Sequence, residues 1–430
     1  MTFSSPSLSE IAERLQGYDP DAMDVATVQA ILSRWVQPLP SSETLALHAA
    51  LDRVLAEDVV SPIDVPAHDN SAMDGYAFAG SQLQPDRGLR LKVAGRALAG
   101  APWLGDIPPG ECIRIMTGAV MPTGLDTVVP QELVTLDGDG FIHITPGLLK
   151  PGANRRRCAE DLQQGAVALT RGERLTPAAL GLLASLGLTE VRVFRALRVA
   201  YFSTGDEILS PGEAPRTGAV YDSNRHTLCA LLRRLGVQVI DSAPVRDDPA
   251  ALADALTRAA NAADVVITSG GVSTGDADHL RTQLKHLGEV AFWRIAMRPG
   301  RPMAVGRLTC ASTPALLFGL PGNPVAAMVT FIALVRPALL QMMGCRTRPQ
   351  PLLLATSSET LHKRPGRTEY QRGIVSSAAD GSLQVRTTGN QGSGVLSSML
   401  QANGLIVLHH GQATVHAGEP VEVLMFDGAT

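Results

Sequence analysis

Lysine is scarce in this chain of 430 residues. Four residues are lysine and 33 are arginine. None of the lysines lies in a G-K-[ST] sequence, which excludes a Walker A phosphate loop. Arginine holds its proton too tightly to serve readily as a base, so a site that needs positive charge here has to use a permanent cation. The four lysines are Lys92, Lys150, Lys285 and Lys363.

Charge is sparse and nearly balanced. Charged residues make up 18% of the chain, against about 25% in typical soluble domains. The net charge of −4 argues against nucleic acid or an anionic membrane as the main partner. An apolar share of 45% excludes a disordered chain, and at about 150 residues per domain the length predicts roughly three domains.

Cysteine clusters and long hydrophobic runs are both missing. Five scattered cysteines form no C-x-x-C pair, which excludes a zinc cluster of that kind and suggests reduced thiols in the cytosol. The N-terminus has no apolar signal region. The longest apolar run, Val325 to Val335, is 11 residues long, short of the roughly 20 that span a bilayer. We therefore expect a cytoplasmic protein, no membrane segment and a buried core helix at that run.

The first third of the chain changes from helical to β-rich character. Residues 25–36 carry apolar positions at helical spacing, and Ser42 predicts the N-cap of a second amphipathic helix within 41–59. Residues 62–154 are rich in glycine and proline around short apolar runs, which predicts a β-rich domain with functional loops. Thr176-Pro177 then predicts a helix ending at Gly187.

Strand and helix patterns alternate from about residue 193. Apolar strands are expected at 198–203, 237–245 and 263–269, with one helix capped by Ser223 or Asn224 and another that starts at Asp248-Pro249. This alternation predicts a doubly wound α/β sheet that ends near Gly344. Five short apolar runs after it predict a small β-barrel or sandwich.

Three polar loops fall where such strands end. They are 203–207, 269–278 and 320–324. Ligands of parallel sheets bind at this edge, glycine lets the backbone approach a phosphate, and hydroxyls donate to it. A single loop of this kind is often only a turn, but two S-T-G-D loops at equivalent places favour a site.

Carboxylates and arginines cluster at the same predicted edge. Acids beside an anionic ligand repel it unless a hard cation bridges them, so Mg²⁺ is expected. Helix capping is the alternative for Asp247 and Asp248. Arg298 and Arg301, held in a proline-rich turn, suit an oxyanion, with a solvated turn as the alternative. The acids are Glu207, Asp247, Asp276 and Asp278.

Other polar segments leave the choice between site and structure open. The loop 69–76 contains donors for a metal or anion, but it also has the composition of an Asx-turn, and 115–119 is equally ambiguous. Residues 155–161 are typical of a charged surface linker. The histidines at 409, 410 and 416 lack a completing acid or cysteine and are interpreted as structural.

Six motifs follow one another along the chain in the order found in the MoeA family, which the sequence therefore resembles. This family comprises the molybdopterin molybdenumtransferases, whose animal counterpart is the E domain of gephyrin. The resemblance covers about residues 24 to 425. SGGVS-x-G-x-x-D also occurs in MogA-type adenylyltransferases, but DNSAMDGYA and the C-terminal β region are specific to MoeA. The motifs are PAHDNSAMDGYA, RIMTGAVMPTGLDTVVPQE, STGDEI, TSGGVSTGDADHL, MRPGRPMA and GLPGNPVAAMVTF.

The resemblance implies an elongated homodimer with four regions per subunit. The family's cleft lies between the α/β domain of one subunit and the inserted β domain of the other, which explains how Asp74 reaches it. The implied regions are a helical and extended linker and dimerisation region (1–62 plus 155–192), an inserted β-rich domain (63–154), an α/β molybdopterin-binding domain (193–345) and a C-terminal β-barrel (346–430).

The implied reaction joins molybdate to adenylylated molybdopterin. Mg²⁺ assists cleavage of the pyrophosphate bond, AMP leaves, and molybdenum stays on the dithiolene. Residues that match the family's catalytic positions are Asp74, Thr117, Glu207, Asp247 and Asp278, with Asp74, Glu207 and Asp247 at the metal. Those matching its pterin, phosphate and molybdate contacts are Asp161, Ser269, Gly270, Gly271, Ser273, Arg294, Arg298, Arg301, Pro321, Pro324, Arg372 and Ser393.

The chain departs from the family at its cations. Members often carry lysine at Arg294, Arg298 or Arg301; arginine keeps the charge for anion binding but is a poor proton donor. The alternative function is a non-catalytic molybdopterin-binding or scaffold protein. A generic Mg-dependent phosphotransferase would need a lysine or P-loop that the sequence lacks. Transient contact with other proteins of molybdenum cofactor biosynthesis is also expected.

Overall fold

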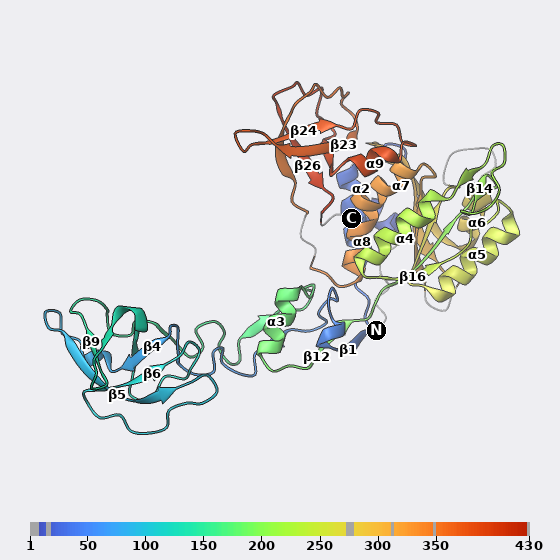
Figure 1. The fold of residues 1–430 in the computed structure, drawn as a ribbon. Helices are drawn as coiled ribbons and strands as arrows, with labels where there is room; N and C mark the ends of the chain where they lie inside the picture. The colour runs from blue at the N-terminus through green and yellow to red at the C-terminus, as the bar shows by residue number, and fades with distance from the viewer. Residues whose placement is uncertain (1–7, 14–18, 272–278, 311–313, 347–349, 428–430) are drawn as a thin grey trace. The chain divides into compact units, whose positions relative to one another are not determined.

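The computed structural model describes residues 8–13, 19–271, 279–310, 314–346 and 350–427, which form two units (Figure 1). Unit 1 contains residues 1–43, 52–56 and 193–430, and unit 2 contains 44–51 and 57–192. Two short strands, β1 (Ser42–Ala46) and β12 (Glu190–Phe194), lie at the points where the chain changes unit.

Unit 1 contains a mixed sheet and a β-barrel. Its helical elements are α1 (Leu8–Glu13), α2 (Val25–Trp35), α4 (Ser223–Leu235), α5 (Pro249–Ala262), α6 (His279–Leu287), α7 (Pro324–Thr330), the π-helix η4 (Phe331–Val335), α8 (Arg336–Met342) and α9 (Ser397–Gln401). Its strands are β13 (Arg198–Ser203), β14 (Ile208–Leu209), β15 (Val220–Tyr221), β16 (Gln238–Asp241), β17 (Val265–Ser269), β18 (Gly288–Arg294), β19 (Met297–Arg298), β20 (Pro302–Leu308), β21 (Ala315–Leu320), β22 (Leu353–Ser357), β23 (Thr368–Ser377), β24 (Leu383–Thr387), β25 (Gly404–Leu408) and β26 (Pro420–Met425).

The mixed sheet confirms the α/β fold. Its order is β16-β13-β17-β21-β20-β18; the first four strands are parallel, and β20 and β18 form an antiparallel edge. Ser203 pairs in register with Ser269, and Ser269 pairs with Leu320. The three polar loops of unit 1 therefore leave the same edge of the sheet.

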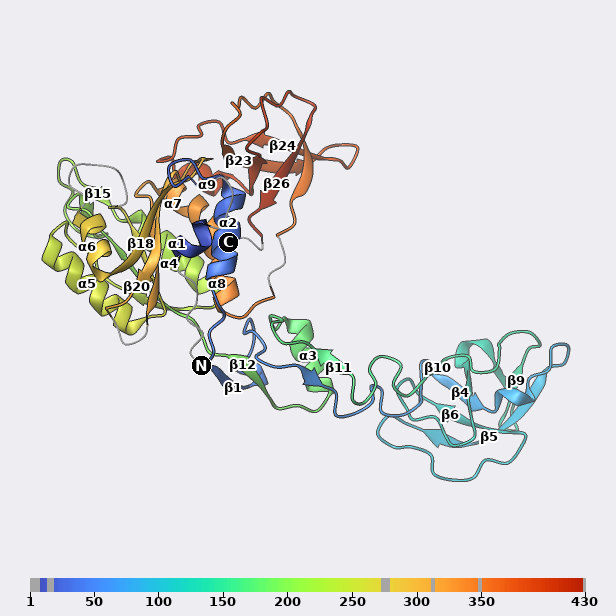
Figure 2. The same cartoon turned by 180° about the vertical axis from the view of Figure 1, so that it is seen from behind.

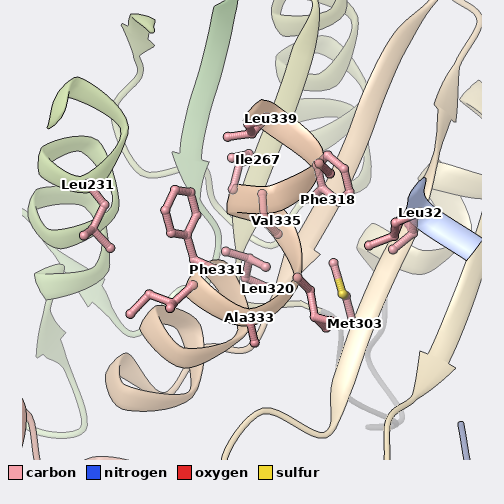
Figure 3. Close-up of a cluster of buried hydrophobic side chains, with 14 of the residues drawn as sticks. Leu32, Leu231, Ile267, Met303, Phe318, Leu320, Phe331, Ala333, Val335 and Leu339 are labelled. Atoms are coloured by element: carbon pink, nitrogen blue, oxygen red, sulfur yellow. The ribbon is translucent and has the colours of Figure 1, made fainter. Parts of the chain in front are cut away.

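Two apolar clusters cover the two faces of this sheet. One buries Tyr201 and Ile267 against α2, α4 and the α7–α8 helix, as Figure 3 shows for Leu231, Phe331 and Leu339. The other buries neighbouring strand residues against α5 and α6. Alternate strand residues point to opposite faces, so near-continuous apolar strands need helices on both sides. Figure 2 shows β18, β20 and helix α2 from behind.

The apolar run at 325–335 lies inside a longer helical stretch. Pro324–Met342 has the length and hydropathy of a membrane span, but 72% of its window is buried within the protein. Val325, Val329 and Val335 are fully buried in the core of unit 1. The prediction of a core helix at this run is confirmed.

Helix α4 begins one residue earlier than expected. Asp222, and not Ser223 or Asn224, is its N-cap, because the Asp222 carboxylate accepts a hydrogen bond from the backbone N–H of Arg225 at 3.0 Å. Asp248 caps α5 as predicted, accepting from Ala251 at 2.9 Å. Asp222 is buried, whereas the cap Asp248 is exposed.

The C-terminal region is a closed barrel of five strands. β23, β24, β22, β26 and β25 pair in that order, and β25 pairs again with β23. Its interior is filled by apolar side chains such as Ile406 and Val423. Strand β19 from the Arg298 turn adds to β23 in parallel, which attaches that turn to the barrel.

Unit 2 contains a six-stranded sheet of order β7-β4-β6-β5-β9-β8 and two short two-stranded ladders, β10-β3 and β11-β2. The β-rich character predicted for residues 62–154 is confirmed. Its elements are η1 (Leu47–Ala49), β2 (Val59–Val60), β3 (Asn70–Ser71), β4 (Gly75–Phe78), η2 (Gly80–Gln82), β5 (Leu89–Ala97), β6 (Glu111–Ile115), β7 (Thr127–Pro130), η3 (Gln131–Leu133), β8 (Thr135–Leu136), β9 (Phe141–Ile144), β10 (Arg155–Arg156), β11 (Val167–Leu169) and α3 (Pro177–Ser185).

The predicted helix after Ser42 is wrong. Residues 42–46 form strand β1, followed by only one 3-10 turn, η1. Helix propensity is a weak preference that tertiary hydrogen bonds override, and here the Leu47 N–H donates to the Thr189 carbonyl at 3.0 Å. Helix α3, capped by Thr176, forms as predicted.

The N-terminal residues group with the α/β sheet. Val28, Ile31 and Trp35 of α2 are buried in the same cluster as the sheet strands. The sequence-based division places these residues in a linker region with 155–192, whereas the structure places 1–43 in unit 1. Helix α2 groups with unit 1 because its apolar face is buried against the sheet, and this burial stabilises the core of that unit.

A partly buried ion pair is expected to stabilise unit 1. Arg195 donates to both oxygens of Asp264, at 2.8 and 2.6 Å. Burial alone would raise the pKa of Asp264, but hydrogen bonds from Arg195 and from the Arg198 N–H outweigh it and hold that pKa below its ordinary value. The carboxylate therefore stabilises the fold above pH 4 or so, and this contribution fades as pH falls toward its lowered pKa.

Asp264→Asn is expected to lower the unfolding free energy of unit 1 by about 2 to 3 kcal/mol at neutral pH, because it leaves Arg195 without its counter-charge. Urea unfolding followed by tryptophan fluorescence measures this in a Trp103→Phe background, where Trp35 and Trp293 both report on unit 1. The control is Asp254→Asn, which breaks an exposed pair with Arg258 and should cost at most about 0.5 kcal/mol. Equal losses in the two variants would contradict the prediction.

Candidate functional site

The loops after β13 and β17 touch each other at the sheet edge. The Thr204 N–H donates to the Ser269 carbonyl at 3.1 Å. A Cβ at Gly270 would lie 2.5 Å from the Thr204 carbonyl oxygen, and φ at Gly270 is +93°. Only glycine fits a left-handed position with the neighbouring backbone this close. Gly271, also at positive φ, packs against Leu280 and Thr204.

Glu207 and Asp247 both contact the Thr204–Asp206 loop. The Glu207 carboxylate folds over Gly205, where a Cβ would lie 2.5 Å from Oε2. Thr204 Oγ1 donates to Asp247 Oδ1 at 3.4 Å, and the Asp247 N–H donates to Asp206 Oδ1 at 3.3 Å. The structure thus brings two predicted acids to one loop and adds Asp206.

This loop offers oxygen donors suited to Mg²⁺. Within the described ranges, no group of three or more His, Cys, Asp or Glu residues is arranged to hold a metal ion. Mg²⁺ commonly takes one or two carboxylates and completes its shell with water and substrate phosphates. Glu207 and Asp247 fit such a partial set. Ser273, Asp276 and Asp278, also predicted here, lie outside the described residues.

The predicted contact residue Ser269 is turned away from the surface. Its side chain is buried, and its Oγ lies 2.6 Å from Tyr201 Oη and 3.3 Å from Ser203 Oγ. Ser203 in turn donates to Asp222 Oδ1 at 2.9 Å. Ser203 belongs to the predicted loop 203–207, whereas Tyr201 and Asp222 are not indicated by the sequence, because a polar residue within a strand or at a helix cap has no distinctive spacing.

The arginine turn is closed by its own backbone. The Ile295 N–H donates to the Arg301 carbonyl at 2.7 Å, and both Arg298 and Arg301 are exposed. Gly300 (φ +102°) packs on α7, where a Cβ would lie 2.2 Å from Thr330 Oγ1. Arg294 ends β18; its N–H binds the Pro20 carbonyl, and its guanidinium lies 4.0 Å from exposed Asp21.

Arg298 and Arg372 line one cavity of about 240 Å³ in unit 1. Arg372 is 1% exposed and donates only to neutral oxygens: the Ser398 hydroxyl at 3.0 Å and the Gly392 and Asn390 carbonyls at 3.1 and 3.4 Å. Among the residues that the structure describes, no carboxylate pairs with it. Burial, with the charge of Arg298 nearby, lowers the pKa of Arg372 to about 10.

This pair of cations favours an anion. At neutral pH Arg372 stays protonated, since its pKa of about 10 is still well above 7. Two positive groups that disfavour each other gain most from a ligand of opposite charge, and a guanidinium matches a tetrahedral oxyanion. Two acids also line the cavity. The Glu369 carboxylate is bonded to Arg367 and Gln371, and Glu359 Oε1 accepts from the Thr387 N–H at 2.6 Å.

The proline loop and the barrel meet beside this cavity. The Val325 N–H, at the start of α7, donates to the Ser393 carbonyl at 3.1 Å. Arg372 holds the same barrel segment through Gly392. Pro321 is buried, and Pro324 is the first residue of α7. The structure therefore brings Arg372, Ser393 and Pro324, which are distant in sequence, to one place in unit 1.

Asp74 and Thr117, both in unit 2, contact each other directly. Asp74 Oδ1 accepts from the N–H and from the hydroxyl of Thr117, each at 2.7 Å. These two bonds hold the pKa of Asp74 below its ordinary value. Asp161 is exposed, and its N–H donates to the Val65 carbonyl. These three residues belong to a different unit from the sheet-edge residues.

Three family models match nearly the whole chain. They are the MoeA N-terminal region (domain I and II) at residues 23–187, the probable molybdopterin binding domain at 200–341, and the MoeA C-terminal region (domain IV) at 355–426. A protein of Haemophilus influenzae named molybdopterin molybdenumtransferase is 43% identical over 93% of this chain and 98% of its own length. The chain belongs to the MoeA family.

Further relatives agree with this assignment. A molybdopterin molybdenumtransferase of Nostoc is 36% identical over 94% of this MoeA-family chain and 93% of its own. A crystal structure of the MoeA protein of Pyrococcus horikoshii covers 94% of this chain with 25% identity and a TM-score of 0.80. The resemblance carried by the motifs is confirmed, and so are the fold class and the prediction of an enzyme.

The close packing of Gly300 generates a test of the arginine turn. In this MoeA-family chain, Gly300→Ala must displace the turn between Arg298 and Arg301, because its Cβ collides with Thr330. We expect the Kd for molybdate to rise about tenfold or more, equivalent to about 1.4 kcal/mol. Isothermal titration calorimetry measures this directly.

Gly366→Ala is the matched control. Gly366 has nearly the same φ, +100°, with nothing within 4 Å of its Cβ position. It should lose about 1 to 2 kcal/mol of stability from backbone strain and keep its molybdate affinity. If the Gly300→Ala protein bound molybdate with the affinity of the parent, the arginine turn would have no role in anion binding.

Proposed function

We propose that this MoeA-family enzyme inserts molybdenum into molybdopterin, using molybdate and adenylylated molybdopterin and releasing AMP. The observation that carries the proposal is the cavity lined by Arg298 and Arg372, because among the described residues neither cation forms an ion pair with a carboxylate. A tetrahedral dianion such as molybdate supplies the missing negative charge. The names of the relatives, which describe transfer of molybdenum to molybdopterin, support molybdopterin as the acceptor.

The loop edge supports the phosphate part of the reaction. Gly270 and Gly271 allow a pyrophosphate to approach the backbone, and the buried Ser269 acts through its carbonyl, which holds Thr204 in place. Glu207 and Asp247 would hold Mg²⁺ or orient the attacking water. Bound Mg²⁺ would neutralise phosphate charge and polarise the bond that breaks.

The positions of the acids and arginines suit a division of labour. Arg298, Arg301 and Arg372 bind and orient the anions, whose mutual repulsion otherwise opposes the reaction. Asp74, kept ionised by Thr117, is proposed to complete the site of the other subunit of a homodimer. In this proposal the enzyme is a homodimer, and the four regions expected from the sequence are its subunit architecture.

The direct test is molybdate-dependent AMP release. Purified protein is incubated with adenylylated molybdopterin, Mg²⁺ and molybdate, and AMP is measured by chromatography. The proposal expects AMP only when molybdate is present. Tight binding of adenylylated molybdopterin without AMP release would contradict it and favour a non-catalytic scaffold.

Asp74→Asn and Glu207→Gln are expected to keep pterin binding and lose molybdate-dependent AMP release by about 100-fold or more, the size expected for a positioned acid or base. In Asp74→Asn the amide oxygen of the new side chain would still accept both bonds from Thr117, so only the charge is removed. Fluorescence titration with molybdopterin measures binding, and the AMP assay measures turnover.

Each variant has a matched control. Asp126 accepts from the Gly80 N–H and the Thr127 hydroxyl, the same pattern as Asp74, and Glu213 lies on the same loop as Glu207. Asp126→Asn and Glu213→Gln should retain turnover. Unchanged turnover in both test variants would refute the proposed roles.

A further inference from the structure

A buried polar network lies beneath the loop edge of the sheet. Tyr201 Oη lies 2.8 Å from Ser203 Oγ and 2.6 Å from Ser269 Oγ, and Ser203 donates to Asp222 Oδ1 at 2.9 Å. All four side chains are at most 3% exposed. Buried polar groups cost free energy unless they are bonded, and a bonded network of this kind makes the structure around it rigid.

Asp222 is the charged member of this network. A carboxylate can only accept, so the Ser203 hydroxyl proton must point toward it. The hydroxyls of Tyr201 and Ser269 are then oriented in turn, each donating along the chain toward Asp222. Burial raises the pKa of Tyr201, which keeps the phenol neutral. Asp222 Oδ2 is buried and has no hydrogen-bond partner among the residues that the structure describes, so the fold keeps this carboxylate at a cost in free energy.

Asp222 also joins the two ends of the segment 204–221. Ser203 immediately precedes the segment and Asp222 immediately follows it, so their side-chain bond closes its base. The Asp222 N–H donates to the Leu209 carbonyl at 2.9 Å, and the Val220 N–H donates to the Glu207 carbonyl at 2.9 Å. The backbone of Glu207 is therefore held by a short ladder that ends at Asp222.

Capping of α4 alone does not explain this arrangement. Asp248 caps α5 with one bond to Ala251 while remaining exposed, whereas Asp222 makes its cap while fully desolvated and bonded to Ser203. An exposed cap would serve the helix without the cost of burying a charge. Besides capping the helix, the buried Asp222 carboxylate closes the base of the segment that carries Glu207.

We propose that Asp222 is a positioning residue for Glu207. By closing the base of the segment 204–221 through Ser203, it fixes the place of the Glu207 carboxylate at the substrate edge. Asp222 does not touch substrate in this proposal; it acts through the segment. The consequence for turnover rests on the proposed function, but the effect on the segment does not.

The test compares Asp222→Ala, Asp222→Asn, Ser203→Ala and the double variant Asp222→Ala/Ser203→Ala in the full-length protein. Hydrogen exchange of the Ile208 and Val220 amides, which bond to the Gly205 and Glu207 carbonyls, reports on the segment. Asp222→Ala should speed their exchange about tenfold or more, since a hydrogen bond to a charged group is lost. Asp222→Asn keeps an acceptor for Ser203 and should restore most of the protection.

The matched control is Asp24→Ala. Asp24 caps α2 and accepts from both the N–H and the hydroxyl of Thr27, at 2.8 Å each, so it loses the same kinds of bond elsewhere in unit 1. It should leave exchange at Ile208 and Val220 unchanged. Equal acceleration by Asp24→Ala and Asp222→Ala, or none by Asp222→Ala, would overturn the proposal.

Kinetics separate positioning from binding. Asp222→Ala should lower kcat for molybdate-dependent AMP release about tenfold or more and leave KM for adenylylated molybdopterin within about threefold, because Gly270 and the arginines stay in place. The double variant should lose no more than Asp222→Ala alone if both residues act through one bond; additive losses would overturn this link. If the parent protein releases no AMP, the proposed function fails, and the exchange measurements still decide the role of Asp222 in the segment.

Discussion

The parallel register of β13, β17 and β21 sets where every loop of the sheet edge begins. Because Ser203, Ser269 and Leu320 are in register, the two S-T-G-D loops and the proline loop start from one edge. Thr204 then reaches the Ser269 backbone, and glycine is the only residue that fits at Gly270. A shift of register by one residue would turn each side chain of the strand to the opposite face of the sheet and separate these loops.

Charge compensation is the second constraint. The partly buried Arg195, for example, is paired with the Asp264 carboxylate. Arg372 departs from this pattern: it is buried, held by neutral oxygens and near Arg298. The carboxylates Glu207 and Asp247 gather at a separate loop. A substrate with several negative groups needs both kinds of site: cationic side chains that bind an anionic group, and carboxylates that bind a metal cation.

The local elements were largely predictable because their causes are local. Thr176-Pro177 starts α3, Asp248-Pro249 starts α5, and the apolar strands of the sheet need no distant information. The predicted helix after Ser42 failed because a non-local hydrogen bond from Leu47 competes with helix formation. Asp222 was missed as a cap because capping residues are interchangeable in sequence, and only burial distinguishes this one.

Motifs and periodicity are properties of neighbouring residues, so they identify the family, the α/β and β-barrel classes and the residue types that are available for the site. Which of those residues meet depends on tertiary packing. Packing buries Ser269 against Tyr201, joins Ser393 to the start of α7 and holds Arg372 by neutral oxygens. Desolvation and long-range hydrogen bonding produce these outcomes, and both depend on packing between segments that are far apart in the chain.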